Sequence, residues 1–178
     1  MFINPKVAIE KGWVKFPDWM NEGQRNRCIQ PNALDFTLDK LFTIKASNTF
    51  SISEDSKTMR GGDPTPLSTG VDGTPAWMLA PKECYDGMSD FYVDVPEGVA
   101  AMLVTRSTFN RNGVFIQSGL YDSGYRGACG YVIYNMGGAA FIAPNTRIGQ
   151  LIFIESENAL MYAGGYNHKE GTHYTENK

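Results

Sequence analysis

The segment GLYDSGYRG, residues 119–127, places an acid, two tyrosines and a base among glycine and serine residues, between two apolar runs. As structure, Asp-Ser-Gly is ordinary turn chemistry, because Asp and Ser bond back to the backbone and Gly accepts a positive φ. As chemistry, a carboxylate in a glycine-rich loop between strands is where a rigid scaffold tends to hold a catalytic base. The segment alone leaves both interpretations of Asp122 open.

Two segments with arginine lie at the ends of apolar strands. Arg106, Ser107 and Thr108 follow VAAMLVT directly, and their guanidinium and hydroxyl groups could donate hydrogen bonds to phosphate oxygens. The same residues could begin a short helix capped by Ser107 or Thr108, and both interpretations can hold. Arg147 and Gln150 open the last strong strand and, taken alone, are more typical of a solvated edge.

Other arrangements of reactive residues are less supported. His168 and His173 lie in a polar tail without a third ligand, which is more typical of surface donors than of a metal site. Tyr162, Tyr166 and Tyr174 could anchor the tail or stack on a flat ligand. The chain has no GxSxG, GxxxxGK[ST] or helix-opening GxGxxG motif, which argues against a serine hydrolase, a P-loop protein and a dinucleotide-binding fold.

Length and composition indicate the number of domains, the state of the cysteines and the location of the protein. A chain of 178 residues fits one domain, here residues 1–178. Its core is large enough to be stable without disulfide bonds or bound metal ions. The three cysteines lack zinc-site spacing and are expected to be free thiols in a reducing compartment. The N-terminus does not resemble a signal peptide and no apolar run is of membrane length, so we expect a cytoplasmic protein with no membrane partner.

Charge narrows the class of ligand. The net charge is -3 and no block of Lys or Arg occurs, which argues against a nucleic-acid partner. A small anionic ligand needs only a few local cations, so any basic site must be local.

The elements that must position these residues are mainly strands. Nineteen glycines, nine prolines and closely spaced short apolar runs predict an all-β antiparallel sandwich or barrel. A short helix is predicted at 6–13, a surface loop at 20–30, a long surface loop at 54–76 and a flexible C-terminal tail at 167–178. The predicted strands are 33–38, 41–46, 49–53, 91–95, 100–105, 113–117, 130–135, 139–143 and 148–155.

From about Gln30 to the C-terminus, the chain resembles the trimeric dUTPase and dCTP deaminase superfamily. Residues 30–38, which contain Asp35, are similar to its first motif, especially in the deaminase form. Residues 106–108 resemble the second motif, 119–127 the third and 147–152 the fourth. Four motifs in this order are specific, although each alone is not. The resemblance implies a distorted β-barrel or jelly roll that assembles as a homotrimer, with active sites between subunits.

The resemblance also implies roles for single residues. Asp122 would be the catalytic base that holds a water for attack on the α-phosphorus of dUTP, giving dUMP and pyrophosphate, with Mg²⁺ bound through the triphosphate. Phosphate contacts would come from Arg106, Ser107, Thr108, Arg147 and Gln150. Tyr125 matches the aromatic that packs under the deoxyribose and excludes a 2′-hydroxyl. The remaining sugar and base contacts are assigned to Gln117, Ser118, Gly119, Leu120 and Tyr166.

The chain also departs from the family. Ten residues after the Asp, the deaminases carry a proton-shuttling Glu, but this chain has Val132, which cannot transfer a proton. The N-terminal motif and the tail nevertheless look more like the deaminase branch. We therefore expect a dUTP diphosphatase. The alternatives are a dCTP deaminase or bifunctional enzyme with another acid in place of the Glu, and a nucleotide-binding regulator with little turnover, against which the intact Asp122 argues.

Base recognition is the least determined feature. The segment between Gly113 and Asp122 is about two residues shorter than in either branch. Its run 114–118 would have to reach the edge of the base, and Gln117 and Ser118 are the only polar side chains of that run. Main-chain groups near Gly119 would favour dUTP strongly over dCTP, whereas a rotating Gln117 amide would also admit dCTP. We expect the main chain to dominate. A chain this compact would suit a phage acting in its host's cytoplasm or a bacterium equally.

Overall fold

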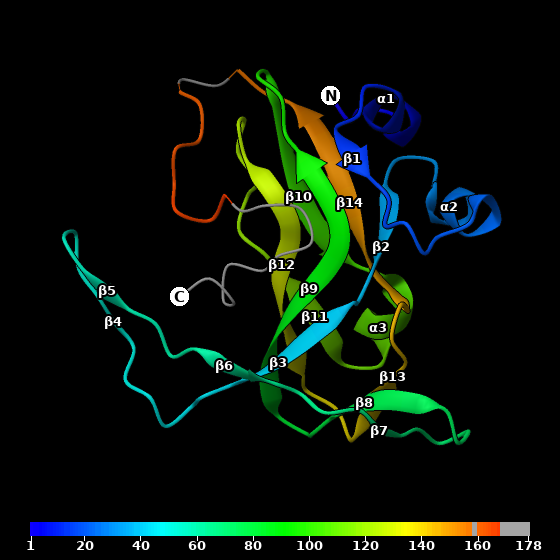
Figure 1. Cartoon of the computed structure of the whole chain (residues 1–178), viewed down its shortest axis with the longest axis vertical. Coiled ribbons are helices and arrows are strands. Elements are labelled where there is room, and N and C mark those ends of the chain that lie inside the picture. The colour runs from blue at the N-terminus through cyan, green and yellow to red at the C-terminus, as the bar shows by residue number, and fades with distance from the viewer. Residues whose placement is uncertain (158–159, 168–178) are drawn as a thin grey trace.

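The computed structural model describes residues 1–157 and 160–167 and shows a mostly β chain (Figure 1). Two antiparallel sheets form the body. The larger sheet has the strand order β11-β12-β9-β3-β6, with β1 paired to β9, and the smaller has the order β10-β14-β2. The larger comprises β1 (Val14–Lys15), β3 (Lys40–Ile44), β6 (Gly62–Pro64), β9 (Glu83–Asp94), β11 (Val114–Gln117) and β12 (Arg126–Asn135). The smaller comprises β2 (Leu34–Thr37), β10 (Val99–Thr105) and β14 (Arg147–Glu155).

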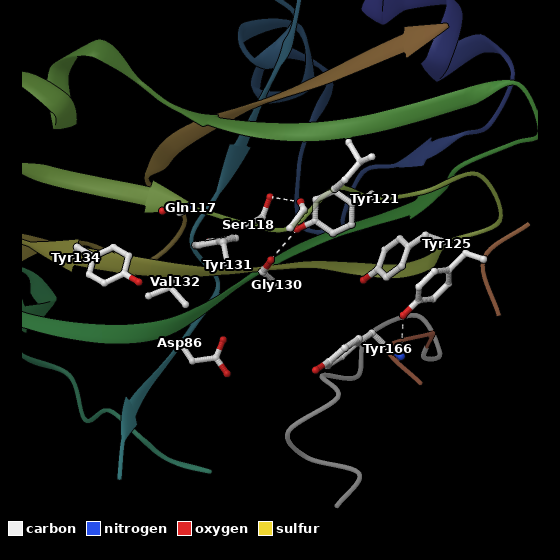
Figure 2. Close-up of a pocket in the computed structure, with 13 residues that line it drawn as sticks. Asp86, Gln117, Ser118, Tyr121, Tyr125, Gly130, Tyr131, Val132, Tyr134 and Tyr166 are labelled. Carbon is white, nitrogen blue, oxygen red and sulfur yellow. Dashed lines mark hydrogen bonds between the residues drawn. The ribbon is translucent and has the colours of Figure 1, made fainter. Parts of the chain in front are cut away.

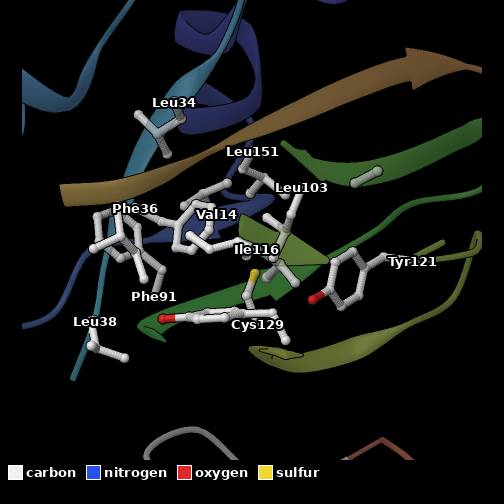
Figure 3. Close-up of a cluster of buried hydrophobic side chains, with 14 of the residues drawn as sticks. Val14, Leu34, Phe36, Leu38, Phe91, Leu103, Ile116, Tyr121, Cys129 and Leu151 are labelled. Atoms are coloured by element: carbon white, nitrogen blue, oxygen red, sulfur yellow. The ribbon is translucent and has the colours of Figure 1, made fainter. Parts of the chain in front are cut away.

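The core lies between these two sheets (Figure 3). Leu34 and Phe36 of β2, Phe91 of β9, and Leu151 and Phe153 of β14 are each at most 1% exposed. Burial of each such side chain contributes about 1.5–3 kcal/mol. The predicted all-β jelly-roll architecture is confirmed, and the two sheets remain separate among the described strands, so the body is a distorted rather than a closed barrel.

The described residues form three short helices beside the sheets: α1 (Pro5–Glu10), α2 (Glu22–Cys28) and α3 (Ser107–Arg111). The predicted N-terminal helix is confirmed as α1. The loop predicted at 20–30 is wrong, because α2 occupies most of it. Asn21 and Gln24 form a capping box there, with reciprocal hydrogen bonds of 2.9 and 2.8 Å to each other's backbone N–H. The segment 20–30 was predicted as a loop because it is polar, and this helix start was therefore missed.

The segment 54–76, predicted as a long surface loop, contains short strands. This part of the chain contains β5 (Lys57–Thr58), β6, β7 (Ser68–Thr69) and the start of β8 (Pro75–Leu79). β4 (Ser51–Ile52) pairs with β5 in a hairpin that projects from the body, and β8 pairs with β7 and β13 (Ala140–Ile142) (Figure 1). β4 lies within the predicted strand 49–53, whereas the two-residue strands β5 and β7 lie in a segment that shows no alternating pattern.

Most of the predicted flexible tail, including His168, His173 and Tyr174, lies outside the described residues. The three cysteines form no disulfide, and burial raises the pKa of Cys28 to about 11 and that of Cys129 to about 12. Within the described ranges, no helix has the length and apolar character needed to span a bilayer.

Candidate functional site

Asp35 is the centre of a cluster made with Arg106, Arg147 and Gln150, here called the Asp35 cluster. Gln150 lies directly opposite Asp35 where β14 pairs with β2, and its Nε2 donates to Asp35 Oδ1 over 3.0 Å. Arg147 Nη1 and Arg106 Nε lie 3.1 and 3.3 Å from Asp35 Oδ2. The structure thus brings together four residues that sequence analysis had assigned to three separate motifs.

The charges in this cluster do not balance. Asp35 is 1% exposed, and burial raises the pKa of its carboxyl above the ordinary value, while the Gln150 hydrogen bond and the charges of Arg106 and Arg147 act in the opposite direction. Two guanidinium groups face one carboxyl, and the arginine side chains keep 30% and 32% exposure. The cluster therefore presents positive charge and N–H donors to solvent, which suits an anionic ligand.

Gly149 explains how β2 and β14 come close enough to build the cluster. A Cβ at this position would collide with the ring of Phe36, so only glycine allows this approach. The register between the two strands shifts between Arg147 and Gly149, which is consistent with a local bulge. The order Arg-Ile-Gly-Gln is thereby needed for Arg147 and Gln150 to reach the same carboxyl.

Ser107 and Thr108 are exposed at the start of α3, directly after Arg106. The predicted short helix is present, but the predicted cap is wrong. Arg106 occupies the N-cap position without a side-chain cap bond, and Ser107 is already the first helical residue. The two hydroxyl groups are therefore not used as helix caps.

The segment around Asp122 is a pinned turn. The carbonyl of Asp122 accepts the N–H of Tyr125 over 3.0 Å, and Gly124 has φ +91, which agrees with a turn that requires glycine at its third position. Ser123 Oγ donates to the carbonyl of Val99 over 2.6 Å, and the N–H of Tyr162 donates to the carbonyl of Ser123 over 2.7 Å. The turn fixes the backbone of Asp122, while its side chain is exposed.

A pocket of about 600 Å³ lies next to this turn (Figure 2). Its volume is in the range of small-molecule sites. The residues predicted to contact sugar and base all line it, namely Gln117, Ser118, Gly119, Leu120, Tyr125 and Tyr166. The structure therefore gathers this predicted set around one cavity.

Tyr125 forms part of an aromatic wall in the pocket. Its ring packs 4.9 Å from that of Tyr121 and 5.9 Å from that of Tyr162, measured between centroids. Its hydroxyl donates to the carbonyl of Ala128 over 2.7 Å. The two ring contacts and the hydrogen bond hold the Tyr125 side chain in place. Its ring is therefore a rigid surface against which the flat or puckered ring of a ligand could pack.

Asp122 does not meet the Asp35 cluster within one chain. Ala101 and Tyr121 exchange two backbone hydrogen bonds of 2.8 Å, which places Asp122 beside the early part of β10. Arg106 lies five residues further along, beyond the end of that strand, which corresponds to roughly 16 Å at the usual rise of a strand. Within one chain, the candidate base therefore lies far from the candidate phosphate donors.

Sequence analysis missed Asp86, which also lines the pocket. Asp86 lies opposite Val132 in the pairing of β9 with β12, and Val132 lies opposite Gln117 in the pairing of β12 with β11. The segment ECYDGM has no strict alternation of polar and apolar residues and was not predicted as strand, so nothing placed its acid beside the third motif.

Among the described residues, no group of three His, Cys, Asp or Glu side chains could hold a metal ion. The carboxylate of Asp35 is already engaged by two arginines and a glutamine. The described part of the chain therefore does not fit a metal site built by protein ligands alone.

Comparison with known proteins shows a matching family, relatives and a solved structure with the same fold. Residues 20–156 match the family model described as dCTP deaminase-like. The probable deoxyuridine 5′-triphosphate nucleotidohydrolase of Methanosarcina mazei is 32% identical over 145 residues, covering 79% of this chain and 81% of that protein. Its counterpart from Methanothermobacter thermautotrophicus is 27% identical, covering 85% and 91%. A solved dCTP deaminase from Agrobacterium tumefaciens shares the fold with a TM-score of 0.63 at 12% identity, covering 87% of this chain and 48% of the other.

Proposed function

The chain belongs to the dCTP deaminase-like family, within the dUTPase and dCTP deaminase superfamily, and we propose that it hydrolyses dUTP to dUMP and pyrophosphate. Relatives named as probable dUTP nucleotidohydrolases, at up to 32% identity over most of the chain, support this activity. The observation that carries it is the place of Asp122 in the chain: the turn that holds its backbone runs between Tyr121 and Tyr125, and both of these tyrosines line the pocket.

Asp122 acts as the general base in this proposal. Its carboxylate accepts a proton from a water molecule, the water oxygen attacks the α-phosphorus, and the bond to the pyrophosphate leaving group breaks. The exposed side chain and the fixed backbone suit this role, because a base must reach water and still keep its direction. Val132 lacks a titratable group, so proton transfer to the base ring by the family's deamination route has no support at that position.

The Asp35 cluster binds the phosphates. Arg106 and Arg147 supply charge, Gln150 supplies a positioned amide, and Ser107 and Thr108 supply hydroxyl donors at the start of α3. Fixed donors stabilise the charge that develops on phosphoryl oxygens during the attack, without reorganising at that moment. Asp35 is a positioning residue, since it holds both guanidinium groups and the amide without facing solvent itself.

The pocket accepts the nucleoside. Tyr125 packs against the deoxyribose and leaves no room for a 2′-hydroxyl, and Tyr166 covers the opposite side (Figure 2). Gln117, Ser118 and the main chain at Gly119 and Leu120 face the pyrimidine. A rigid aromatic floor and a short polar rim are typical of sites that orient a small ligand.

A homotrimer completes the site in this proposal. Asp122 and the Asp35 cluster lie roughly 16 Å apart along one chain by strand geometry, which is too far for one water and one triphosphate to meet both. A neighbouring subunit that contributes its Asp35 cluster to the pocket would remove this separation. Closed cyclic symmetry gives every subunit the same two half-sites.

The divalent cation, proposed here as Mg²⁺, is carried mainly by the substrate. The described residues offer no three-ligand carboxylate, imidazole or thiolate group, and Mg²⁺ commonly binds through substrate phosphates. When bound, the cation neutralises phosphate charge and so lowers the repulsion that an attacking water meets.

The decisive experiment measures pyrophosphate and ammonia released from each deoxynucleoside triphosphate by the purified chain. We expect pyrophosphate from dUTP and no ammonia from any substrate. Ammonia released from dCTP would instead identify a deaminase or bifunctional enzyme. Tight binding of dUTP without release of either product would identify a nucleotide-binding regulator.

A further inference from the structure

Three side chains form a row across the pocket face of the larger sheet. Gln117 on β11 lies opposite Val132 on β12, and Val132 lies opposite Asp86 on β9. Directly opposed residues of antiparallel strands point to the same face, with Cβ atoms about 4.5–5.5 Å apart. All three line the pocket, so its wall presents an amide, an apolar group and a carboxyl in that order.

Asp86 is held on a rigid part of the fold. β9 pairs with β12 on one side and with β3 on the other, where Asp86 lies opposite the buried Phe42. The next residue, Gly87, lies so close to the ring of Tyr131 that a Cβ there would collide with it. The backbone at Asp86 is therefore fixed between two strands, unlike that of Ser118 and Gly119, which follow the end of β11.

The carboxyl of Asp86 is directed toward the space enclosed by the pocket residues. Figure 2 shows it between Val132 and Tyr166, on the same side of the sheet as Gln117. Asp86 is half-buried, so a ligand that fills the pocket would cover it from solvent. A hydrogen bond made or missed at this point would then affect binding more strongly than one on an open surface.

A carboxylate accepts hydrogen bonds and donates none. At position 4 of a pyrimidine, cytosine carries an amino group, which donates, and uracil carries a carbonyl, which accepts. A carboxylate facing that edge accepts a hydrogen bond from the amino group of cytosine, whereas the carbonyl of uracil has no hydrogen to donate to it. The chemistry of the wall at Asp86 thus favours a 4-aminopyrimidine.

Resting on the proposed diphosphatase activity, we propose that Asp86 is a specificity-determining residue that admits dCTP as a second substrate. The Asp86 carboxylate accepts a hydrogen bond from the 4-amino group. Water adds to the α-phosphorus, the bond to pyrophosphate breaks, and the products are dCMP and pyrophosphate with the base unchanged. The sequence-based expectation differs, because it has main-chain groups near Gly119 and Leu120 that favour dUTP strongly over dCTP.

The test compares the wild type with Asp86→Asn, Asp86→Ala and the control Glu83→Gln. Glu83 is an exposed acid on the same strand that does not line the pocket. Pyrophosphate and ammonia are measured with dUTP and with dCTP. We expect the wild type to release pyrophosphate from both without ammonia, and Asp86→Asn to lower kcat/KM for dCTP about tenfold while dUTP turnover is kept, because an Asn amide can rotate to donate.

Three results would overturn the proposal: wild-type hydrolysis of dUTP but not of dCTP, an unchanged ratio of the two substrates in Asp86→Asn, or ammonia release that Asp86→Asn abolishes. Calorimetric binding of the α,β-imido analogues of dUTP and dCTP separates this inference from the proposed function. If the wild type hydrolyses neither substrate, the diphosphatase proposal fails. An analogue preference for cytosine that Asp86→Asn removes would still support the role of Asp86, and its absence would refute it.

Discussion

The amide of Gln150 donates a 3.0 Å hydrogen bond to the buried carboxylate of Asp35, across 115 residues of sequence. This contact joins the first and fourth sequence motifs, and the arginines of the second and fourth motifs converge on the same carboxylate. The motifs are therefore parts of one electrostatic unit. Asp35 sets the direction of the groups proposed to bind phosphate, although it is too deeply buried to contact phosphate itself.

Asp35→Asn should weaken substrate binding more than it slows chemistry. The amide keeps the size of the side chain but removes the charge that holds Arg106 and Arg147. We expect KM for dUTP to rise about tenfold with a smaller change in kcat, because misdirected donors lose ground-state phosphate contacts. The matched control is Asp94→Asn, whose carboxylate pairs with Arg126 at 3.1 Å on the surface. Equal KM values in the two variants would contradict the positioning role.

Asp122→Asn should bind nucleotide and fail to turn it over. The amide keeps the hydrogen-bonding size of the side chain, and the turn is held by backbone and Ser123 contacts that the change leaves intact. Loss of a general base typically lowers the rate by about 10²–10⁴. Steady-state pyrophosphate release and calorimetry with an α,β-imido analogue measure the two properties. Turnover like that of the wild type would remove Asp122 from the mechanism.

The sequence predicted most of the fold because the strands carry long-range apolar patterns. Predicted strands such as 100–105, 130–135 and 148–155 coincide with parts of β10, β12 and β14. Local polarity was less informative: α2 begins with a two-residue capping box inside a segment that reads as a loop. Two-residue strands such as β5 and β7, which were not predicted, depend on contacts that no local pattern encodes.

Part of the candidate site also follows from the sequence. Gly119, Leu120 and Tyr125 lie within the third motif and Gln117 and Ser118 directly precede it, and the structure gathers all five around one pocket. Asp86 could not be found in this way, because its place beside Val132 is a consequence of strand register between segments 46 residues apart in number. Register is decided by the packing of the whole sheet, which a single segment does not reveal.

Tyr125→Ala should reduce the preference for dUTP over UTP, whereas Tyr125→Phe should keep it. The ring is the proposed barrier to a 2′-hydroxyl, and Phe preserves the ring while losing only the hydrogen bond to Ala128. We expect Tyr125→Phe to cost about 1 kcal/mol of stability. Comparison of kcat/KM for dUTP and UTP in both variants, together with thermal unfolding, checks this. Equal turnover of dUTP and UTP by the wild type would refute the assignment.

Removal of divalent cations should stop turnover without unfolding the protein. The described residues contain no three-ligand metal cluster, so we expect a chelator to leave Tm unchanged while pyrophosphate release falls to background. Titration with Mg²⁺ should restore activity in proportion to the Mg²⁺-nucleotide complex rather than to free cation. A Tm that drops on chelation in the absence of nucleotide would point to a structural metal and contradict a cation carried by the substrate.

Mixing two inactive variants should restore activity if sites form between subunits. Asp122→Asn lacks the base but keeps the Asp35 cluster, and Arg106→Gln weakens the cluster but keeps the base. After equal amounts are dissociated and reassembled, about a quarter of the sites in random trimers should combine an intact Asp122 with an intact Arg106 from a neighbour. Light scattering should report a trimer at assay concentration. Because Asp122 and Arg106 lie roughly 16 Å apart along one chain, a monomer with full activity, or no recovery in mixed trimers, would show that each chain forms its site alone.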